Sequence, residues 1–423
     1  MGTAPLVATE PPLISDPAIY GGGVPHEEFA RRRRECPVDW VEEKALWRYG
    51  AGGAASVRGS GYWAVMRHET VAAVSRNPAV FSSGERGAFL PDPKSRQDLE
   101  RTRQLLINMD APEHRRIRRF VAAAFSPRTM QLLEEGIRAH ARRLVAAALD
   151  REEFDVVRDL AAELPLLSLA DLLGMPRADR GLLFEWSNRL VGFDDPDYGG
   201  SVDDYKRTFS EAFEYALELA AAKRRRPGDD LVSELVRLAV DPGHLSEREY
   251  CNLWVLLVVA GNETTRHLLS GGILALLEWP EERGRLVADP GLTPLAVEEL
   301  LRWVSPVMQF RRTATCDVEL EGRRVRAGDK VVLYYASANR DESVFPDADR
   351  LDVGRQPNPQ LAFGVGPHFC LGAHLARLEA AALVDELRPH LASLQVSGEV
   401  VRLESNFMSG IKSMPARFGG ARA

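Results

Sequence analysis

The sequence predicts a single, mainly helical α+β domain with a large helical part and smaller β-sheets. Helical patterns follow one another from about residue 112 to 303, whereas strand-like pieces cluster toward the two ends of the 423-residue chain. No internal repeat, low-complexity tract or linker separates the two kinds of segment. We therefore expect one domain over residues 21–423, preceded by an N-terminal arm over residues 1–20.

Three segments read as strands. Residues 61–66, GYWAVM, alternate like a short strand, and residues 330–335, KVVLYY, read as a buried one. Residues 318–325 read as a hairpin that turns at Glu321-Gly322. Between the ends, stretches rich in Pro, Gly and Asp, such as residues 193–200, break the helical middle into pieces.

Composition narrows the class of protein. A hydrophobic content of 45% and a charged content of 27% are typical of a soluble globular protein, and a net charge of −7 argues against a nucleic-acid binder. Two basic runs stand out, residues 31–34 and 115–119; for the first we expect a solvated helix face. The N-terminus does not read as a secretory signal, and the longest apolar run, residues 253–261, is too short to span a bilayer. We expect a cytoplasmic protein.

Residues 363–372, FGVGPHFCLG, hold the strongest functional signal. The four cysteines are scattered without a CxxC pair, and one of them, Cys370, lies in this glycine-rich loop just before an apolar helical pattern. The dipole and free N–H groups of a helix N-terminus favour a thiolate there. Gly364, Gly366 and Gly372 leave room for a large flat group, and an exposed thiolate is what a haem iron needs to split dioxygen. An ordinary turn with a buried cysteine is the simpler alternative.

A second signal lies at residues 260–265, AGNETT, inside an otherwise very apolar helix. Helical spacing places Leu256, Ala260, Glu263 and Thr264 on one face. Small residues there leave room for a ligand, and an acid beside an alcohol can pass protons. The alternative is a Thr264 hydroxyl bonded to the carbonyl four residues back, with Glu263 at the surface.

Three further segments have charged side chains at helical or turn spacing. His114 and Arg118 lie four residues apart after Asp110, which can cap a helix, so they can hold an anionic group or face water. Glu299 and Arg302 lie three residues apart and can pair on a helix. The turn-rich stretch 338–352 carries Arg350, which can complete an ionic cluster with that pair.

In their order along the chain, these five segments resemble the cytochrome P450 superfamily of haem-thiolate monooxygenases, and the resemblance runs from about Tyr62 to the C-terminus. The resemblance implies a fold with haem b buried between two helices. Because no anchor or fused reductase is evident, the chain looks like a bacterial soluble member. Such members take electrons from NAD(P)H through a separate ferredoxin and ferredoxin reductase, without membrane insertion or nucleic acid.

The resemblance also assigns roles to residues. It makes Cys370 the iron ligand, and Glu263 and Thr264 the catalytic pair that delivers protons. It makes Glu299, Arg302 and Arg350 a structural ionic triad. The residues that it implies for cofactor binding are His114, Arg118, Ala260, Arg312, Phe363, His368, Cys370 and Gly372. Gln360 stands where many relatives have His, and we expect little consequence.

The pocket that the resemblance implies is mainly apolar, so we expect a hydrophobic substrate with few polar anchors. Its walls are expected from residues 82–108 and 184–205, and from Leu256, Val259, Val307, Met308, Phe310 and Phe407. Residues 259–266 and 405–412 look like the actinobacterial steroid and branched-lipid hydroxylase branch. This implies hydroxylation of a C–H bond in a steroid, terpenoid or branched lipid.

Three other readings stay open from the sequence. One is a tailoring oxidase of a specialised-metabolite pathway, and another is a non-catalytic haem-binding protein. In the third, Cys370 is a nucleophile with His368 or His374 as its base. For the monooxygenase reading, we expect an acidic ferredoxin to dock on arginines of the basic run, Arg115, Arg116 or Arg119.

Overall fold

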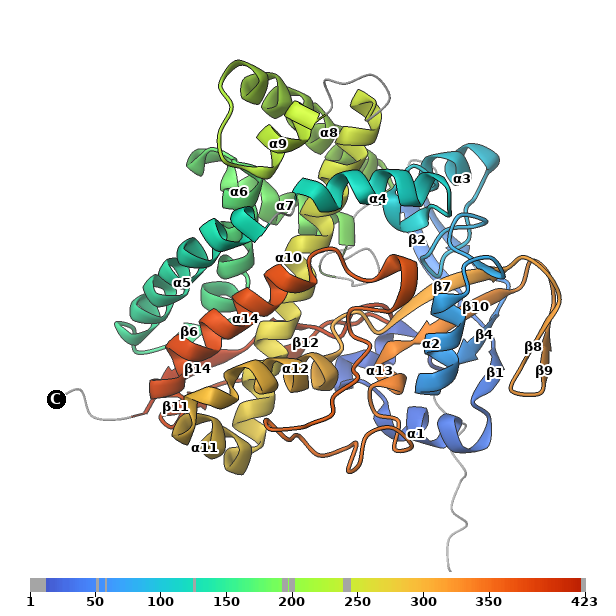
Figure 1. Ribbon diagram of the computed structural model, residues 1–423. Helices are drawn as coiled ribbons and strands as arrows, with labels where there is room; N and C mark the ends of the chain where they lie inside the picture. The colour runs from blue at the N-terminus through green and yellow to red at the C-terminus, as the bar shows by residue number, and fades with distance from the viewer. Residues whose placement is uncertain are drawn as a thin grey trace, which may run out of the picture.

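The helices form one large body, and most strands gather to one side of it (Figure 1). The computed structural model describes residues 13–50, 53–57, 59–124, 127–191, 197, 202–238 and 245–419. The predicted α+β architecture, with a large helical part and small sheets, is confirmed. Of the break predicted at residues 193–200, all but Asp197 lies outside the described residues.

The longest helix, α10 (Glu247–Glu278), runs through the middle of the helical body (Figure 1). It begins with a capping box, in which the Ser246 side chain accepts from the Glu249 N–H and the Glu249 side chain accepts in return. Its apolar residues pack into the main core against α6, α7, α8, α12 and α14. The helices are α1 (His26–Glu35), α2 (His68–Arg76), α3 (Arg96–Thr102), α4 (Glu113–Ala124), α5 (Pro127–Leu149), α6 (Glu163–Leu173), α7 (Arg180–Val191), α8 (Val202–Arg225), α9 (Leu231–Leu238), α11 (Pro280–Ala288), α12 (Thr293–Val304), α13 (Tyr335–Ala338) and α14 (Ala373–Leu387).

The main sheet has five strands in the order β1 (Val38–Val41), β4 (Tyr62–Val65), β10 (Lys330–Tyr334), β7 (Gln309–Ala314) and β5 (Phe81–Ser82). Strand β10 runs parallel to β4 and antiparallel to β7, which joins the two ends of the chain. Strands β4 and β10 are the two predicted strands. The predicted hairpin is β8 (Val318–Leu320) and β9 (Arg323–Val325), and Glu321 and Gly322 turn it with φ of 48° and 75°.

The remaining strands are short and form separate small sheets. They are β2 (Leu46–Gly50), β3 (Gly53–Val57), β6 (Phe154–Asp155), β11 (Leu394–Val396), β12 (Val401–Arg402), β13 (Ile411–Ser413) and β14 (Pro415–Phe418). In the stretches of chain described above, no helix is both long and apolar enough to cross a membrane.

The N-terminal segment is tied into the fold from residue 13 onward. Ile14 and Tyr20 are buried, and the Asn406 amide donates to the Ser15 carbonyl at 2.7 Å. One prediction here is wrong in part, because Arg32 and Arg33 of the basic run are buried rather than solvated. Arg32 pairs with Glu28, and Arg33 reaches across to Glu342, so each buried cation has a carboxylate.

Candidate active site

The cysteine loop precedes α14 and is shaped by its glycines. Gly364 and Gly366 adopt left-handed φ values of 67° and 80°, and a Cβ on Gly366 would lie 2.9 Å from the Ser75 carbonyl oxygen. The Cys370 N–H donates to the Phe363 carbonyl at 2.9 Å, which folds the loop back on itself. Backbone conformation therefore requires glycine at these two positions, while room for a large flat group stays a prediction.

Cys370 is exposed to solvent, yet burial is the largest influence on its thiol and raises the pKa. These two observations agree if the sulfur faces a space enclosed by protein rather than the outer surface. A hydrogen bond from the Gly372 N–H, together with Arg118 and Arg377, acts in the opposite direction and favours the thiolate. Arg377 of α14 also lies over the Phe363 ring at 4.6 Å, which packs the first residue of the loop against that helix.

Four basic side chains from three separate segments meet near the sulfur. His114 and Arg118 come from α4, Arg312 from β7 and His368 from the cysteine loop. The two imidazole rings lie 4.2 Å apart, and Nε2 of His114 is buried without a hydrogen-bond partner among the described residues. Arg118 donates to the Phe369 carbonyl. The structure thus gathers all four residues expected to bind the haem carboxylates.

The electrostatics of this cluster suit an anion. Burial, Arg118 and Arg312 lower the pKa of His114 to about 4, although Asp110 opposes them, and burial and Arg312 hold the pKa of His368 well below its usual range. A carboxylate placed here would accept from guanidinium and imidazole donors. A cysteine that could bind iron and a cluster of donors that could bind carboxylates are the groups that a haem needs, so these residues fit one.

On α10 the predicted acid and alcohol do not share a face as expected. Ala260 is exposed and Thr264 half-buried, whereas Glu263 is only 3% exposed. Adjacent helical positions are about 100° apart, so the two side chains point in different directions. The Thr264 hydroxyl donates to the Ala260 carbonyl at 2.9 Å, which is the alternative that the sequence left open for the alcohol.

Glu263 is not at the surface, as the other half of that alternative required. Its carboxylate pairs with Arg266, and the Nε2 atom of His267 lies 3.6 Å from Oε2. Burial raises the pKa of Glu263, and Arg266 opposes that rise. Burial therefore favours the protonated form of this carboxyl, whereas the Arg266 guanidinium favours the ionised form.

The sequence analysis missed a second buried acid, Glu379 of α14. Burial raises its pKa to about 8, and the hydroxyls of Ser168 and Thr265 reduce the rise. Thr265 follows Thr264 directly, so this acid lies near the middle of α10. One signal could have revealed it: Glu379 occupies the apolar stripe between Leu375 and Leu383, where a carboxylate is out of place.

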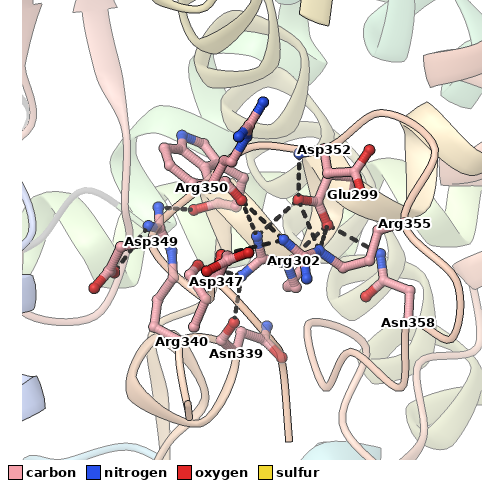
Figure 2. A network of polar contacts seen from close by, with 12 residues as sticks. Glu299, Arg302, Asn339, Arg340, Asp347, Asp349, Arg350, Asp352, Arg355 and Asn358 are labelled. Atoms are coloured by element: carbon pink, nitrogen blue, oxygen red, sulfur yellow. Dashed lines mark hydrogen bonds and ion pairs between the residues drawn. The ribbon is translucent and has the colours of Figure 1, made fainter.

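A buried ionic network is centred on Glu299 and Arg302 of α12 (Figure 2). Arg302 donates to both oxygens of Glu299 at 2.7 Å, and both side chains are fully buried. The prediction of Arg350 as the third member is wrong for its side chain, which is 56% exposed and lies 3.8 to 3.9 Å from Glu281 and Glu282. Only the carbonyl of Arg350 takes part, by accepting from Arg302. Arg355 takes that place, with its Nε 3.1 Å from both oxygens of Glu299.

Asp110 also has another role than the one predicted. In the part of the chain described here, its carboxylate accepts from the N–H groups of Ser83 and Gly84 rather than from α4. It therefore fixes the start of the 84–92 segment to the entry of α4. The helix itself begins at Glu113 and carries His114 and Arg118 on one side, as expected.

The predicted substrate-contacting residues divide into two groups. Leu256, Val259, Val307 and Phe310 are half-buried, and Phe407 packs against Phe310 with ring centroids 5.5 Å apart. Met308 is not supported as a pocket residue, because it is fully buried in the cluster that contains Ile14, Tyr62 and Tyr334. Side chains alternate along the extended chain, so Met308 faces away from its neighbour Val307.

Comparisons with known proteins agree with this geometry. A model of the cytochrome P450 family matches residues 290–387. The methyl-branched lipid omega-hydroxylase of Mycobacterium tuberculosis is 42% identical, covering 92% of this chain and 89% of that protein. The steroid C26-monooxygenase of Rhodococcus jostii is 37% identical, covering 94% and 83%. The structure of a Mycobacterium marinum cytochrome P450 in complex with pseudoionone superposes with a TM-score of 0.85 at 38% identity, covering 95% and 97%.

The similarity to the curated relatives covers 92% and 94% of the chain. Since it accompanies a donor set that fits haem, the chain belongs to the cytochrome P450 family of haem-thiolate monooxygenases.

Proposed function

We propose that this monooxygenase hydroxylates the end of a methyl-branched alkyl chain, carried by a branched lipid or by a steroid side chain. The observation that carries the proposal is the 42% identity to a methyl-branched lipid omega-hydroxylase. The relative at 37% identity is named for oxidation at steroid C26, which is also a chain-end position. The expected pocket residues Leu256, Val259, Val307 and Phe310 are half-buried and apolar, which suits such a chain.

In this proposal Cys370 holds the haem iron, and the Gly372 N–H supports its thiolate. His114, Arg118, Arg312 and His368 would bind the haem carboxylates, and the small side chain of Ala260 would leave room for the haem. When bound, the haem supplies dioxygen activation, which a thiolate ligand favours. The protein's contribution is to orient the substrate, exclude water and move protons.

In this proposal, residues of α10 move the protons. The Thr264 hydroxyl donates its hydrogen to the Ala260 carbonyl, so its oxygen keeps lone pairs with which to orient a water molecule. Glu263 stores a proton in the buried interior next to Arg266 and His267. Water between the two side chains would connect the acid to the alcohol.

Electrons are proposed to come from NAD(P)H through a separate ferredoxin and its reductase. Arg115 and Arg119 of α4 are exposed, and their neighbour Arg118 bonds the cysteine loop at Phe369. Arg116 is a weaker candidate, because it already pairs with Glu113 and Glu249. An acidic ferredoxin would therefore meet Arg115 and Arg119 close to the sulfur side.

The test begins with the absorbance spectrum of the reduced, carbon-monoxide-treated protein, which reports thiolate-ligated haem. The purified protein is then given a methyl-branched fatty acid, its unbranched isomer and a cholestane-type sterol, with a ferredoxin and reductase. We expect hydroxylation at the branched chain end, identified by mass spectrometry. Equal turnover of the unbranched isomer, or oxidation within the chain or the sterol rings, would contradict the proposal.

A further inference from the structure

Residues 84–92, which we call the wall segment, carry an aromatic ring of the expected pocket to the edge of the sheet. The Phe89 ring contacts those of Phe310 and Phe407, with centroids 5.9 and 5.4 Å apart. The Arg311 N–H of β7 donates to the Ala88 carbonyl at 2.8 Å. The position of Phe89 thus depends on how the wall segment is attached to β7.

The far end of the wall segment is held by charge. The Asp92 carboxylate accepts from Arg311 at 2.8 Å and from Lys330 at 2.9 Å. Lys330 also donates to Glu43 at 2.7 Å, and Arg311 donates to the Leu90 carbonyl at 3.3 Å. Two cations of adjacent strands, β7 and β10, therefore hold one acid of the wall segment.

The burial of these groups is unequal. The side chains of Arg311 and Lys330 are 1% and 2% exposed, whereas that of Asp92 is 31% exposed. Burial disfavours the ionised form of Asp92, but Arg311 and Lys330 more than offset it and lower the pKa, so the group is charged at neutral pH. The two cations are fixed in the sheet, while the acid has an open side at which water can replace them.

The near end of the wall segment is attached differently. Asn108 accepts from the Ala88 N–H at 2.8 Å, and Arg103 donates to the carbonyls of Gly84 and Glu85. These bonds tie residues 84–88 to the chain around α3. Phe89 lies between this attachment, through Asn108 and Arg103, and the one through Asp92, so release of Asp92 would free the ring without detaching the whole segment.

We propose that Asp92 is a positioning residue: its ion pairs with Arg311 and Lys330 hold Phe89 against Phe310 and Phe407 and so control passage of bulky ligands past that ring. The inference rests on the proposed function only in taking Phe310 and Phe407 as pocket residues. A hydrogen bond to a charged group is worth about tenfold or more in an equilibrium constant. Loss of the Asp92 charge should therefore raise the population of the displaced Phe89 by about tenfold.

The experiment compares haem-loaded wild type with Asp92→Asn, Asp92→Glu, Glu43→Gln and Phe89→Ala. Glu43→Gln is the matched control, because it removes a carboxylate from the same Lys330 but from outside the wall segment. Hydrogen exchange reports the opening of residues 84–92. Stopped-flow absorbance reports the release of two iron ligands, clotrimazole as the bulky probe and imidazole as the small one.

For Asp92→Asn we expect about tenfold faster exchange at residues 89–92 and about tenfold faster clotrimazole release, with imidazole release unchanged. Asp92→Glu should restore both rates toward wild type, and Glu43→Gln should leave them unchanged. Phe89→Ala should speed clotrimazole release while leaving the ion pairs intact, which keeps the test decisive if Asp92→Asn is poorly folded. Equal effects of Asp92→Asn and Glu43→Gln, or no effect of Phe89→Ala, would overturn the proposal. Neither probe is a lipid, so a wrong substrate assignment would not change these results.

Discussion

Because Arg355 rather than Arg350 pairs with Glu299, replacing each of these two arginines by alanine should lower the free energy of unfolding by very different amounts. Arg355 is 7% exposed on its side chain and bonds Glu299 together with the carbonyls of Pro346 and Arg350. Removing one partner of a buried ion pair costs about 3 to 5 kcal/mol, and Glu299 keeps Arg302, so we take about 3 kcal/mol for Arg355→Ala. Arg350→Ala removes an exposed guanidinium that lies 3.8 to 3.9 Å from Glu281 and Glu282, and the buried Glu282 keeps its 2.7 Å pair with Arg285, so the cost should be about 0 to 1 kcal/mol.

These free energies translate into melting temperatures. An unfolding entropy of about 2 cal/mol/K per residue gives about 0.9 kcal/mol/K for 423 residues, so 3 kcal/mol lowers Tm by about 3 °C. Calorimetry of the haem-loaded variants measures the shift, and the reduced carbon-monoxide spectrum reports whether the thiolate remains on iron. We expect Arg355→Ala to lower Tm and to lose the thiolate-ligated spectrum progressively, while Arg350→Ala stays near wild type. If Arg350→Ala proved the more destabilising variant, the assignment of Arg355 would be refuted.

Three further predictions follow from the site. Thr264→Ala should reduce the product formed per NAD(P)H consumed by about 100-fold, the lower range for loss of a proton-transfer group, and peroxide release should rise in parallel. Thr264→Ser should recover much of the product yield. Unchanged product yield per NAD(P)H in Thr264→Ala would count against a role of the Thr264 hydroxyl in proton transfer. Burial raises the pKa of Glu379 to about 8 in the folded protein, from an ordinary value of 4.5, so its contribution to stability is present below about pH 4.5 and is lost as the pH rises through about 8. Glu379→Gln should therefore gain stability over wild type across that window in denaturant titrations, and parallel pH profiles would contradict the shift. Charge reversal at Arg115 and Arg119 should slow reduction of the haem-loaded protein by an acidic ferredoxin in stopped-flow experiments and weaken the salt dependence of that rate. Charge reversal at Arg34, which is exposed on α1, should leave the rate unchanged. Equal slowing by both changes would refute α4 as the docking surface.

Sequence reasoning succeeded where the chemistry is encoded locally. The strand over residues 61–66, the hairpin turn at Glu321-Gly322 and the glycines at 364 and 366 each follow from a few adjacent residues. Family resemblance extended this to His114, Arg118, Arg312 and His368, whose meeting no local pattern could show. It also favours a haem ligand over a nucleophile at Cys370, a choice that the residue alone leaves open, and this assignment stays a prediction.

Sequence reasoning failed where a side chain's partner is distant or where two candidates compete. Arg350 and Arg355 are both compatible with a third place in the ionic network, and only the turn at residues 352–355 decides which one reaches Glu299. The basic run at residues 31–34 looks solvated because Glu342, the partner of Arg33, lies far along the chain. Spacing predicts which residues share a helix face, but it does not identify the acidic partner that another element contributes to an ion pair.

The acid and alcohol of α10 show the same limit inside a single helix. Helical spacing places Leu256, Ala260, Glu263 and Thr264 on one face. A face that includes all four, however, covers both the exposed side and the buried side of the helix. The alcohol lies toward the exposed Ala260, and the acid lies toward Arg266 and His267. A proton held by Glu263 must therefore travel around the helix rather than along one face. This makes the water between Glu263 and Thr264 as much a part of the proposed proton path as either side chain.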